Sequence, residues 1–168
     1  ALDIYVRDIA RNKNELLTKN LSSSTKNLFW LNENEIVFDH DHRGSARVMR
    51  LNLLNKKLYE VIPSFKDQFY LSSTYQDSLC GVYINSNRPS EVGMISNSKL
   101  ETLTQHNELI LSQYELGVTN EINYQSPHKM NIQGWYITPP NFDKSKKYPL
   151  ILVIPVSYTH LTLPTIYS

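Results

Sequence analysis

The sequence has few of the features that indicate a disulfide-stabilised scaffold, a membrane-spanning helix or the binding of a strongly charged partner. Cys80 is the single cysteine among 168 residues, so no internal disulfide can form. Lys and Arg number 17 against 16 Asp and Glu, and the resulting net charge of +1 gives no field for holding nucleic acid or an acidic membrane surface. No apolar run approaches the roughly 20 residues that a membrane-spanning helix needs.

Glycine is also scarce, and its placement excludes several catalytic motifs. The chain has five glycines, and none is spaced as Gly-x-Ser-x-Gly, the turn that carries the nucleophile of many serine hydrolases. A glycine-rich phosphate loop and a basic stripe are absent too. Ser157 and His160 have the right side chains for a catalytic pair, but they lie in a C-terminal tail that looks foreign to the chain. We therefore predict no catalytic and no cofactor-binding residue here.

The N-terminus enters a strand pattern directly, without a starting Met. Residues 1–7 read Ala-Leu-Asp-Ile-Tyr-Val-Arg, and no signal peptide precedes them. Because this start looks cut, the missing signal peptide says nothing about secretion. The compartment, cytoplasmic or periplasmic and secreted, is left open, and so is the oligomeric state.

What the sequence does contain is a repeat of 42 to 44 residues through its first two thirds. Residues 3–9 align with residues 47–53, and Lys57 aligns with Lys99 in a third copy. Each copy is a strand, a polar turn and a second strand. The other half of the unit, an aromatic strand, a polar turn and a further strand, occurs at residues 29–38 and again at residues 69–84. The unit is therefore about four short strands separated by turns.

Four strands in this period are typical of a β-propeller blade, which takes about 40–45 residues in WD-type repeats. A β-sandwich with regularly spaced strands would explain the alternation but not the aligned turn residues. A blade needs a neighbour on either face, and closed propellers have typically 4–8 blades. Residues 1–105 hold about two and a half, so we expect the others upstream of Ala1.

Two groups of residues could suggest a ligand site, and neither is predicted to be one. In Asp39-His40-Asp41-His42, alternate residues of a strand end point to opposite sides, so at most two could face one ion, whereas zinc takes three or four ligands. We expect a solvated turn there, just before Arg43, and no metal-binding residue. Four aromatic side chains at strand positions are expected to be packed and to need no ligand: Trp30, Tyr70, Tyr83 and Trp135.

The repeat pattern stops after residue 105. Residues 106–120 are expected to be a connector, partly extended. Three strands should follow, at residues 121–125, 132–137 and 150–154, with Pro139 ending the second because proline cannot donate to a β-ladder. The third is an unbroken aliphatic run, Leu150-Ile151-Leu152-Val153-Ile154, which favours a strand buried on both faces of an α/β sheet.

From about residue 103 the sequence resembles the prolyl oligopeptidase family, in particular its acylaminoacyl-peptidase-like and dipeptidyl-peptidase-like branches. The resemblance rests on Glu121-Ile122-Asn123-Tyr124-Gln125-Ser126, on Gly134-Trp135 followed by Pro139, and on Lys146-Lys147-Tyr148-Pro149 leading into the aliphatic run. It extends loosely over the blades back to Ala1. The turn Ser126-Pro127-His128-Lys129 departs from the family, which often has Asp-Gly there, and this puts the turn type in doubt.

The resemblance implies a mostly β chain, with a partial β-propeller followed by the first strands of an α/β-hydrolase domain. It implies propeller blades at 1–105, a connector at 106–120 and the start of a peptidase domain at 121–154. The parent protein would be a serine peptidase that needs no cofactor and hydrolyses short peptides through an acyl-serine, with the propeller restricting access. Its triad would lie downstream of Ile154, so this chain is expected to be inactive.

The tail 155–168 does not continue the family pattern. Val156 to Thr165 can be back-translated as a string that looks like read-through into a sequencing-library adapter, so we expect a non-native tail rather than a divergent loop. Two rival functions stay open at this point. One is a non-enzymatic propeller resembling the periplasmic TolB type, and the other is an esterase on the same scaffold. Partial blades and a lone apolar strand also predict that the isolated chain aggregates or is poorly ordered.

Overall fold

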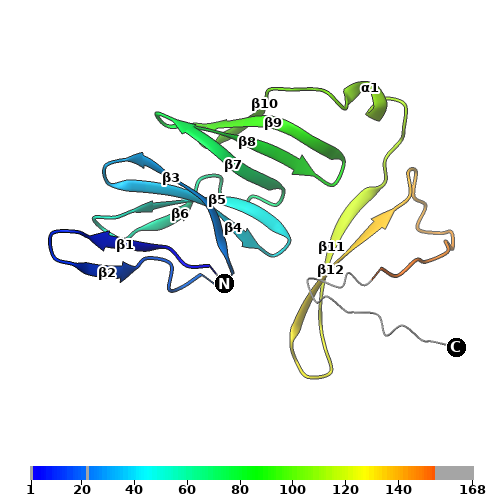
Figure 1. The fold of residues 1–168 in the computed structure, drawn as a ribbon. Coiled ribbons are helices and arrows are strands. Elements are labelled where there is room, and N and C mark those ends of the chain that lie inside the picture. Colours follow the sequence, from blue (N-terminus) through cyan, green and yellow to red (C-terminus); the bar gives the residue numbers. More distant parts are fainter. Residues whose placement is uncertain (1, 22, 154–168) are drawn as a thin grey trace, which may run out of the picture.

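The computed structural model describes residues 2–21 and 23–153, which are mostly β-strand (Figure 1). The elements in chain order are β1 (Tyr5–Asp8), β2 (Lys13–Leu16), β3 (Thr25–Asn32), β4 (Glu35–His42), β5 (Ser45–Asn52), β6 (Leu58–Glu60), β7 (Gln68–Tyr75), β8 (Ser78–Asn85), β9 (Arg88–Ser96), β10 (Lys99–Thr102), α1 (Glu108–Leu111), β11 (Val118–Gln125) and β12 (Asn131–Thr138).

The repeat takes the form of two antiparallel meanders of four strands each. β3, β4, β5 and β6 make the first and β7, β8, β9 and β10 the second, with neighbours in the chain paired in each. One parallel bridge, Ala46 with Gln68, joins β5 to β7. The hairpin β1–β2 precedes them and aligns with β5–β6 and β9–β10 in the repeat. Open sheets of this kind are consistent with part of a propeller, and the predicted four-strand unit is confirmed.

Each face of the first meander packs against a neighbour, which explains where the core lies. Ile36 and Phe38 of β4 join a cluster with Ile4, which precedes the β1–β2 hairpin. Val37, between them in the chain, joins a second cluster with Phe69 and other residues of the second meander. Successive strand residues point to opposite faces, so β4 is buried on both. Each of these large side chains contributes roughly 1.5–3 kcal/mol when fully buried.

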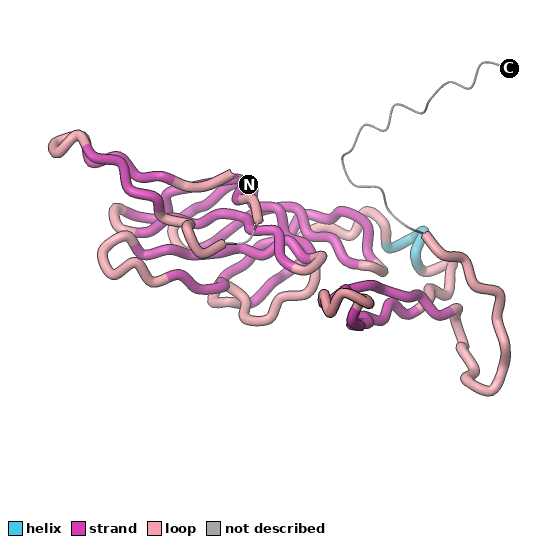
Figure 2. The backbone as a smooth tube through the Cα atoms, turned by 90° about the horizontal axis from the view of Figure 1, so that it is seen from below, coloured by secondary structure: helices cyan, strands magenta, loops and turns pink. Residues whose placement is uncertain are grey.

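Beyond the second meander the chain crosses to a separate hairpin. The connector contains the short helix α1, which the sequence did not predict, and β11 begins at Val118, earlier than expected. β11 and β12 pair along their whole length, from Val118 with Thr138 to Gln125 with Asn131. β12 ends directly before Pro139, as predicted. Figure 2 shows this hairpin projecting at one end of the body that the meanders form.

The expected strand at residues 150–154 is wrong as far as the structure describes it. Leu150 to Val153 form no strand, and their side chains are 76–87% exposed. Ile154 and the tail 155–168 lie outside the described residues. A strand buried on both faces needs paired strands at its edges and helices over its faces. No described segment supplies them, so the aliphatic run finds no partner.

The aromatic residues also divide differently from the prediction. Tyr83 is buried, and its hydroxyl donates to Asp67 Oδ2 at 2.7 Å. Trp30 and Trp135 are more than half exposed, so these two side chains are not packed in a core. Trp30 lies on β3, at the edge of the sheet, between Phe29 and Leu31, which pack against the cluster shared with the second meander, so its side chain points to the opposite face.

Candidate functional site

The segment Asp39–His42 is not the solvated turn that its composition suggested. It forms the last four residues of β4, and the turn begins only at Arg43. Asp39 is 1% exposed and His40 is 4% exposed. In residues 2–21 and 23–153, no group of three or more His, Cys, Asp or Glu lies close enough to hold a metal ion.

Asp39 connects the two meanders. Its Oδ1 and Oδ2 each lie 3.1 Å from the backbone nitrogen of Leu71 on β7, which donates to them. The side-chain amide of Asn27 on β3 donates to Oδ2 at 2.6 Å. Burial outweighs these hydrogen bonds and raises the pKa of the Asp39 carboxyl group to about 6. This carboxyl group is therefore a structural acceptor rather than a group exposed to a substrate.

The two histidines beside it do not form a catalytic pair with a serine. The His40 and His42 rings lie 6.0 Å apart between centroids, and burial lowers the pKa of both imidazoles. The nearby Ser23 hydroxyl donates to the carbonyl of Asp41, and the Ser45 hydroxyl to the carbonyl of His42. Among the described residues, no serine hydroxyl is hydrogen-bonded to an imidazole, so the nucleophile–base geometry of a triad is absent there.

The turn between β4 and β5 is where the separate hairpin meets the sheets. Arg43 Nη2 donates to Asn123 Oδ1 on β11 at 3.1 Å. The indole of Trp135 on β12 lies against Gly44, where an added Cβ would come 2.5 Å from the ring. Gly44 also has a φ of +76°, which non-glycine residues rarely adopt. Both the backbone conformation and the indole contact therefore require glycine at this turn.

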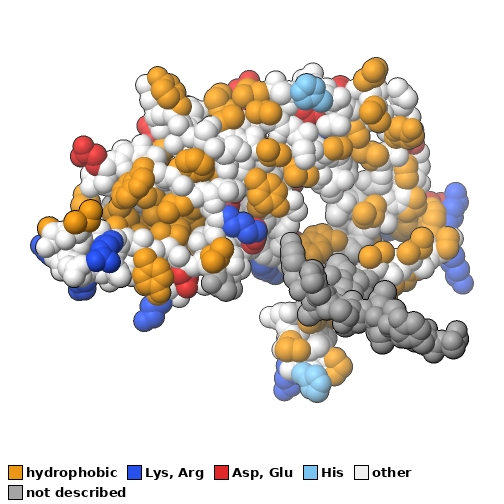
Figure 3. Space-filling model, in the orientation of Figure 1, with side chains coloured by type: hydrophobic (Ala, Val, Ile, Leu, Met, Phe, Trp, Pro, Cys, Tyr) orange, Lys and Arg blue, Asp and Glu red, His pale blue; other side chains and the backbone are white. Residues whose placement is uncertain are grey.

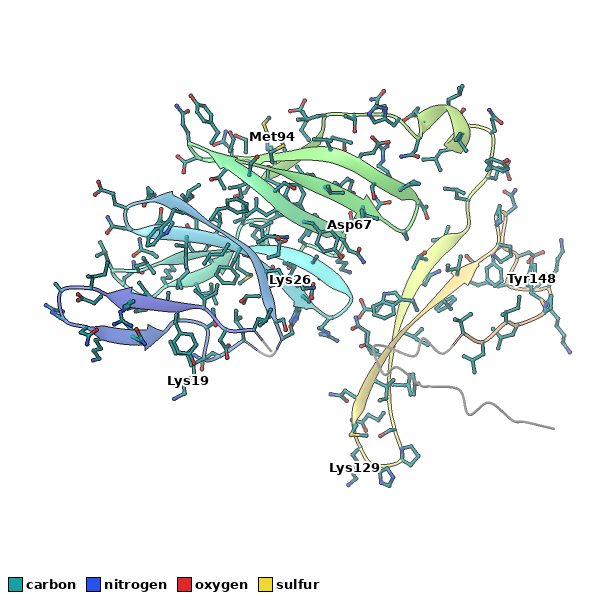
Figure 4. The ribbon with its side chains drawn as sticks, in the orientation of Figure 1. Lys19, Lys26, Asp67, Met94, Lys129 and Tyr148 are labelled. Carbon is teal, nitrogen blue, oxygen red and sulfur yellow. The ribbon has the colours of Figure 1, made fainter. Side chains whose placement is uncertain are left out.

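A cleft of about 340 Å³ opens beside this contact, and Figure 3 shows the hollow between the sheets and the hairpin. Asp67, whose side chain is labelled in Figure 4, lies at its edge on the meander side. Glu121 lines it from the hairpin, and hydrogen bonds from Asn123 and Gln133, together with the charges of Arg43 and Lys66, lower the pKa of its carboxyl group. The lining is Gly44, Lys66, Asp67, Gln68, Ile84, Asn85, Ser86, Thr119, Glu121 and Trp135.

The side chains that line this cleft are mostly polar or charged. It offers charges of both signs, amide groups and an exposed indole. The described lining contains no histidine, and among the described residues no hydrogen bond joins the Ser86 hydroxyl to Lys66, Asp67 or Glu121. Sequence reasoning did not find this cleft, because it forms between turns of the repeat and a hairpin that lies about 80 residues further along the chain.

A second contact fixes the start of the connector. Both carboxylate oxygens of Glu91, on β9, accept hydrogen bonds from residues 104–107, namely from the Thr104 hydroxyl, from the backbone of His106 and from the backbone and side chain of Asn107. The Thr104 bond contributes most to lowering the pKa of this carboxyl group, which falls to about 2. Glu91 therefore stays ionised and determines where the chain leaves the second meander.

Comparison with known proteins places this arrangement among peptidase structures. Acylaminoacyl peptidase in complex with Z-Gly-Gly-Phe-chloromethyl ketone superimposes with a TM-score of 0.66 at 18% identity, over 88% of this chain and 22% of that one. The uncomplexed Pyrococcus horikoshii acylaminoacyl peptidase gives 0.63 at 18% identity over 82% of this chain and 21% of that one. The AtxE2 isopeptidase gives 0.67 at 12% identity, over 82% and 22%.

The described chain thus spans about a fifth of the length of these structures. No family model matches the sequence, and no curated protein matches it. In the residues that the structure describes, no helix is long and apolar enough to cross a membrane. The resemblance to the prolyl oligopeptidase family that the sequence indicates is confirmed at the level of the fold, which this chain shares with part of acylaminoacyl peptidase and of an isopeptidase.

Proposed function

We propose that this chain is part of a serine peptidase of the prolyl oligopeptidase family that hydrolyses short peptides. One observation carries the proposal. Two four-stranded meanders are followed by a connector and a separate hairpin, and 82–88% of this chain superimposes on peptidases with TM-scores of 0.63 to 0.67. A propeller alone would not account for the separate hairpin β11–β12.

In this proposal residues 1–105 are propeller blades, residues 106–120 a connector and residues 121–154 the start of the peptidase domain. Residues 155–168 are a non-native tail. The reaction is acyl transfer through a covalent acyl-serine, with backbone N–H groups stabilising the oxyanion. The triad belongs to sequence beyond Ile154, so this chain by itself has no nucleophile to acylate. Peptides are the substrate class, and one of the similar peptidases has an astexin-3 peptide bound.

Sequencing the parent gene past Ile154 tests the proposal. We expect Gly-x-Ser-x-Gly, then Asp and then His, in the order found in α/β-hydrolases. Genomic DNA that encodes Val156–Ser168 in frame and then terminates would refute it. Further blade repeats after Ile154 would instead favour a TolB-like binding propeller.

Activity distinguishes the peptidase from an esterase on the same scaffold. The parent protein should react with a fluorophosphonate probe and cleave an N-acylated peptide with a higher kcat/KM than a p-nitrophenyl ester of the same acyl group. The 168-residue chain should show neither labelling nor cleavage. Labelling of this chain at any serine would contradict the assignment of the triad to a later segment.

A further inference from the structure

The seam between the two meanders depends on few polar contacts. One backbone bridge, Ala46 with Gln68, joins β5 and β7. At the margin of the seam the Thr74 hydroxyl donates to the Trp30 carbonyl at 3.4 Å and Arg50 lies 3.5 Å from Asp77. The interior of the seam is apolar, with Val37, Leu71 and other buried side chains in one cluster. Apolar packing is non-directional, so a directional contact within it has a large influence on how the two sheets are held. Asp39 supplies such a contact.

The Asp39 carboxyl group accepts a hydrogen bond from one backbone N–H across the seam, that of Leu71. The Leu71 N–H is shared between both carboxyl oxygens, each 3.1 Å from the nitrogen. Leu71 is itself 2% exposed and lies where the register of β7 against β8 shifts, between Leu71 and Ser73. Water therefore has little access to this N–H. A buried N–H without an acceptor is destabilising, and a carboxyl oxygen of Asp39 satisfies this donor in either protonation state.

The charges around Asp39 do not neutralise it. Lys26 on β3 (Figure 4) lies 2.7 Å from Asp41 Oδ2, so its nearest carboxylate is Asp41. Asp41 on β4 itself raises the pKa of Asp39, while Lys26 lowers it. β7 presents the Leu71 N–H and β3 presents the Asn27 amide, both uncharged donors. The neighbouring His40 is a buried imidazole whose own pKa is lowered by burial, so it resists taking up a positive charge, and its effect on stability as the pH falls is opposite in sign to that of Asp39.

We propose that Asp39 is a proton-sensitive latch between the two meanders, which holds the seam more firmly when its carboxyl group is protonated than when it is ionised. On acidification a proton from solvent binds one carboxyl oxygen, and the other oxygen keeps the Leu71 N–H. The new O–H can donate to the Asn27 side-chain oxygen once that amide rotates. No bond across the seam is lost, and the cost of a buried negative charge is removed.

The sign of the pH dependence follows from proton binding. Asp39 has a higher pKa in the folded chain, about 6, than the ordinary value of 3.8 that applies when the chain is unfolded. The folded state therefore binds more protons between these values. The contribution of Asp39 to stability is greatest below pH 3.8, falls as the pH rises to about 6, and changes little above that.

Nuclear magnetic resonance of the full chain tests the latch. The isotope-labelled chain carries Ile151→Lys and Val153→Lys, two exposed positions outside the strands, to limit self-association. We expect the Asp39 carboxyl carbon to titrate with a midpoint near pH 6, and the Leu71 amide to follow the same midpoint. After correction for intrinsic exchange, the ratio of the opening constant at the Leu71 amide in the unsubstituted chain to that in Asp39→Asn should fall by up to about tenfold per pH unit between pH 6 and pH 4, because His40 and His42 contribute equally in both chains.

Two matched variants separate Asp39 from its charged neighbours. Asp39→Asn keeps an acceptor of the same shape and should abolish the midpoint at the Leu71 amide. Asp41→Asn removes the neighbouring carboxylate, which makes no bond to Leu71, and should leave a midpoint there, shifted downwards because a negative neighbour is gone.

Two results would overturn the latch. One is an Asp39 carboxyl that titrates near its ordinary value in the folded chain. The other is a Leu71 midpoint that survives Asp39→Asn, which would assign the effect to a histidine. Should Asp39→Asn fail to fold, the unsubstituted carboxyl and the Leu71 amide still decide the matter, because different midpoints for the two refute the latch.

Discussion

At the scale of single residues, Gly44 is the position where the smallest change should have the largest effect on how the hairpin meets the sheets. We predict that Gly44→Ala separates Trp135 from the turn, because the new Cβ would come 2.5 Å and 2.6 Å from two carbons of the indole. The positive φ adds about 1 kcal/mol of backbone strain. With Trp30→Phe, Trp135 is the sole tryptophan, and its emission should shift to longer wavelength as it leaves the contact.

Gly134→Ala is the matched control for this prediction. Its added Cβ would meet Ile122 at 3.4 Å and 3.7 Å, which is close to ordinary contact, and no positive φ constrains it. It lies beside Trp135 in the chain, so it also tests whether any substitution near the indole alters the emission. An unchanged spectrum in Gly44→Ala, or an equal shift in both variants, would show that the turn does not hold the ring.

Residue chemistry read from sequence failed at Asp39 and His40 for a physical reason. Charged and polar residues are usually exposed, and a run of four next to Arg43-Gly44 is typical of a turn. Here β4 continues to His42, and its last residues face a neighbouring meander. An acceptor for the Leu71 N–H explains Asp39, but that N–H lies 32 residues away in the chain, and no local pattern reveals it.

At the scale of elements, the sequence predicted which strands are present better than it predicted where they begin and end. The repeat and its polar turns predicted the four-strand unit, because turns such as Arg43-Gly44 and Asn97-Ser98 need residues that accept positive φ. Pro139 marked the end of β12. The helix α1 was missed because it has only four residues, too few to show a helical period.

Glu91 allows a prediction about the connector as an element. Glu91→Gln should loosen residues 104–107, since the amide nitrogen of glutamine cannot accept the hydrogen bonds that the second carboxylate oxygen accepts. Because the folded carboxyl has a pKa lowered to about 2, its contribution is present above the ordinary value of 4.5 and is lost as the pH falls towards 2. Hydrogen exchange at the His106 and Asn107 amides should therefore be faster in the variant at pH 7.

The same measurement at low pH supplies a second comparison. Near pH 2 the carboxyl of the unsubstituted chain becomes protonated, and the difference between the two chains should shrink. Glu101→Gln on β10, an exposed glutamate that makes none of these bonds, should leave the two amides unchanged. Equal exchange in Glu91→Gln and the unsubstituted chain at pH 7 would mean that the connector is held by other contacts.

At the scale of the whole molecule, burial could not be predicted from the aliphatic run alone. Leu150–Val153 has the composition of a strand inside a parallel sheet, yet all four side chains are exposed. The first meander shows the opposite outcome, because β4 has a packed neighbour on each face and is buried on both. Burying a hydrophobic segment lowers the free energy of the folded chain. Which part of the molecule buries it depends on the rest of the sequence.

This contrast predicts that the same pair of substitutions has different effects in the 168-residue chain and in the proposed parent peptidase. In the 168-residue chain, Ile151→Lys with Val153→Lys should reduce self-association in sedimentation and leave the thermal midpoint of the meanders unchanged, because these side chains pack against nothing in the described fold. In the proposed parent peptidase the run would lie inside a sheet, where unpaired buried lysines cost several kcal/mol and should prevent folding. Lys144→Glu with Lys147→Glu, in the charged stretch before the run, is the control and should have little effect in either chain. A parent enzyme that folds and cleaves peptides with both lysines in place would remove the run from the interior of any hydrolase sheet.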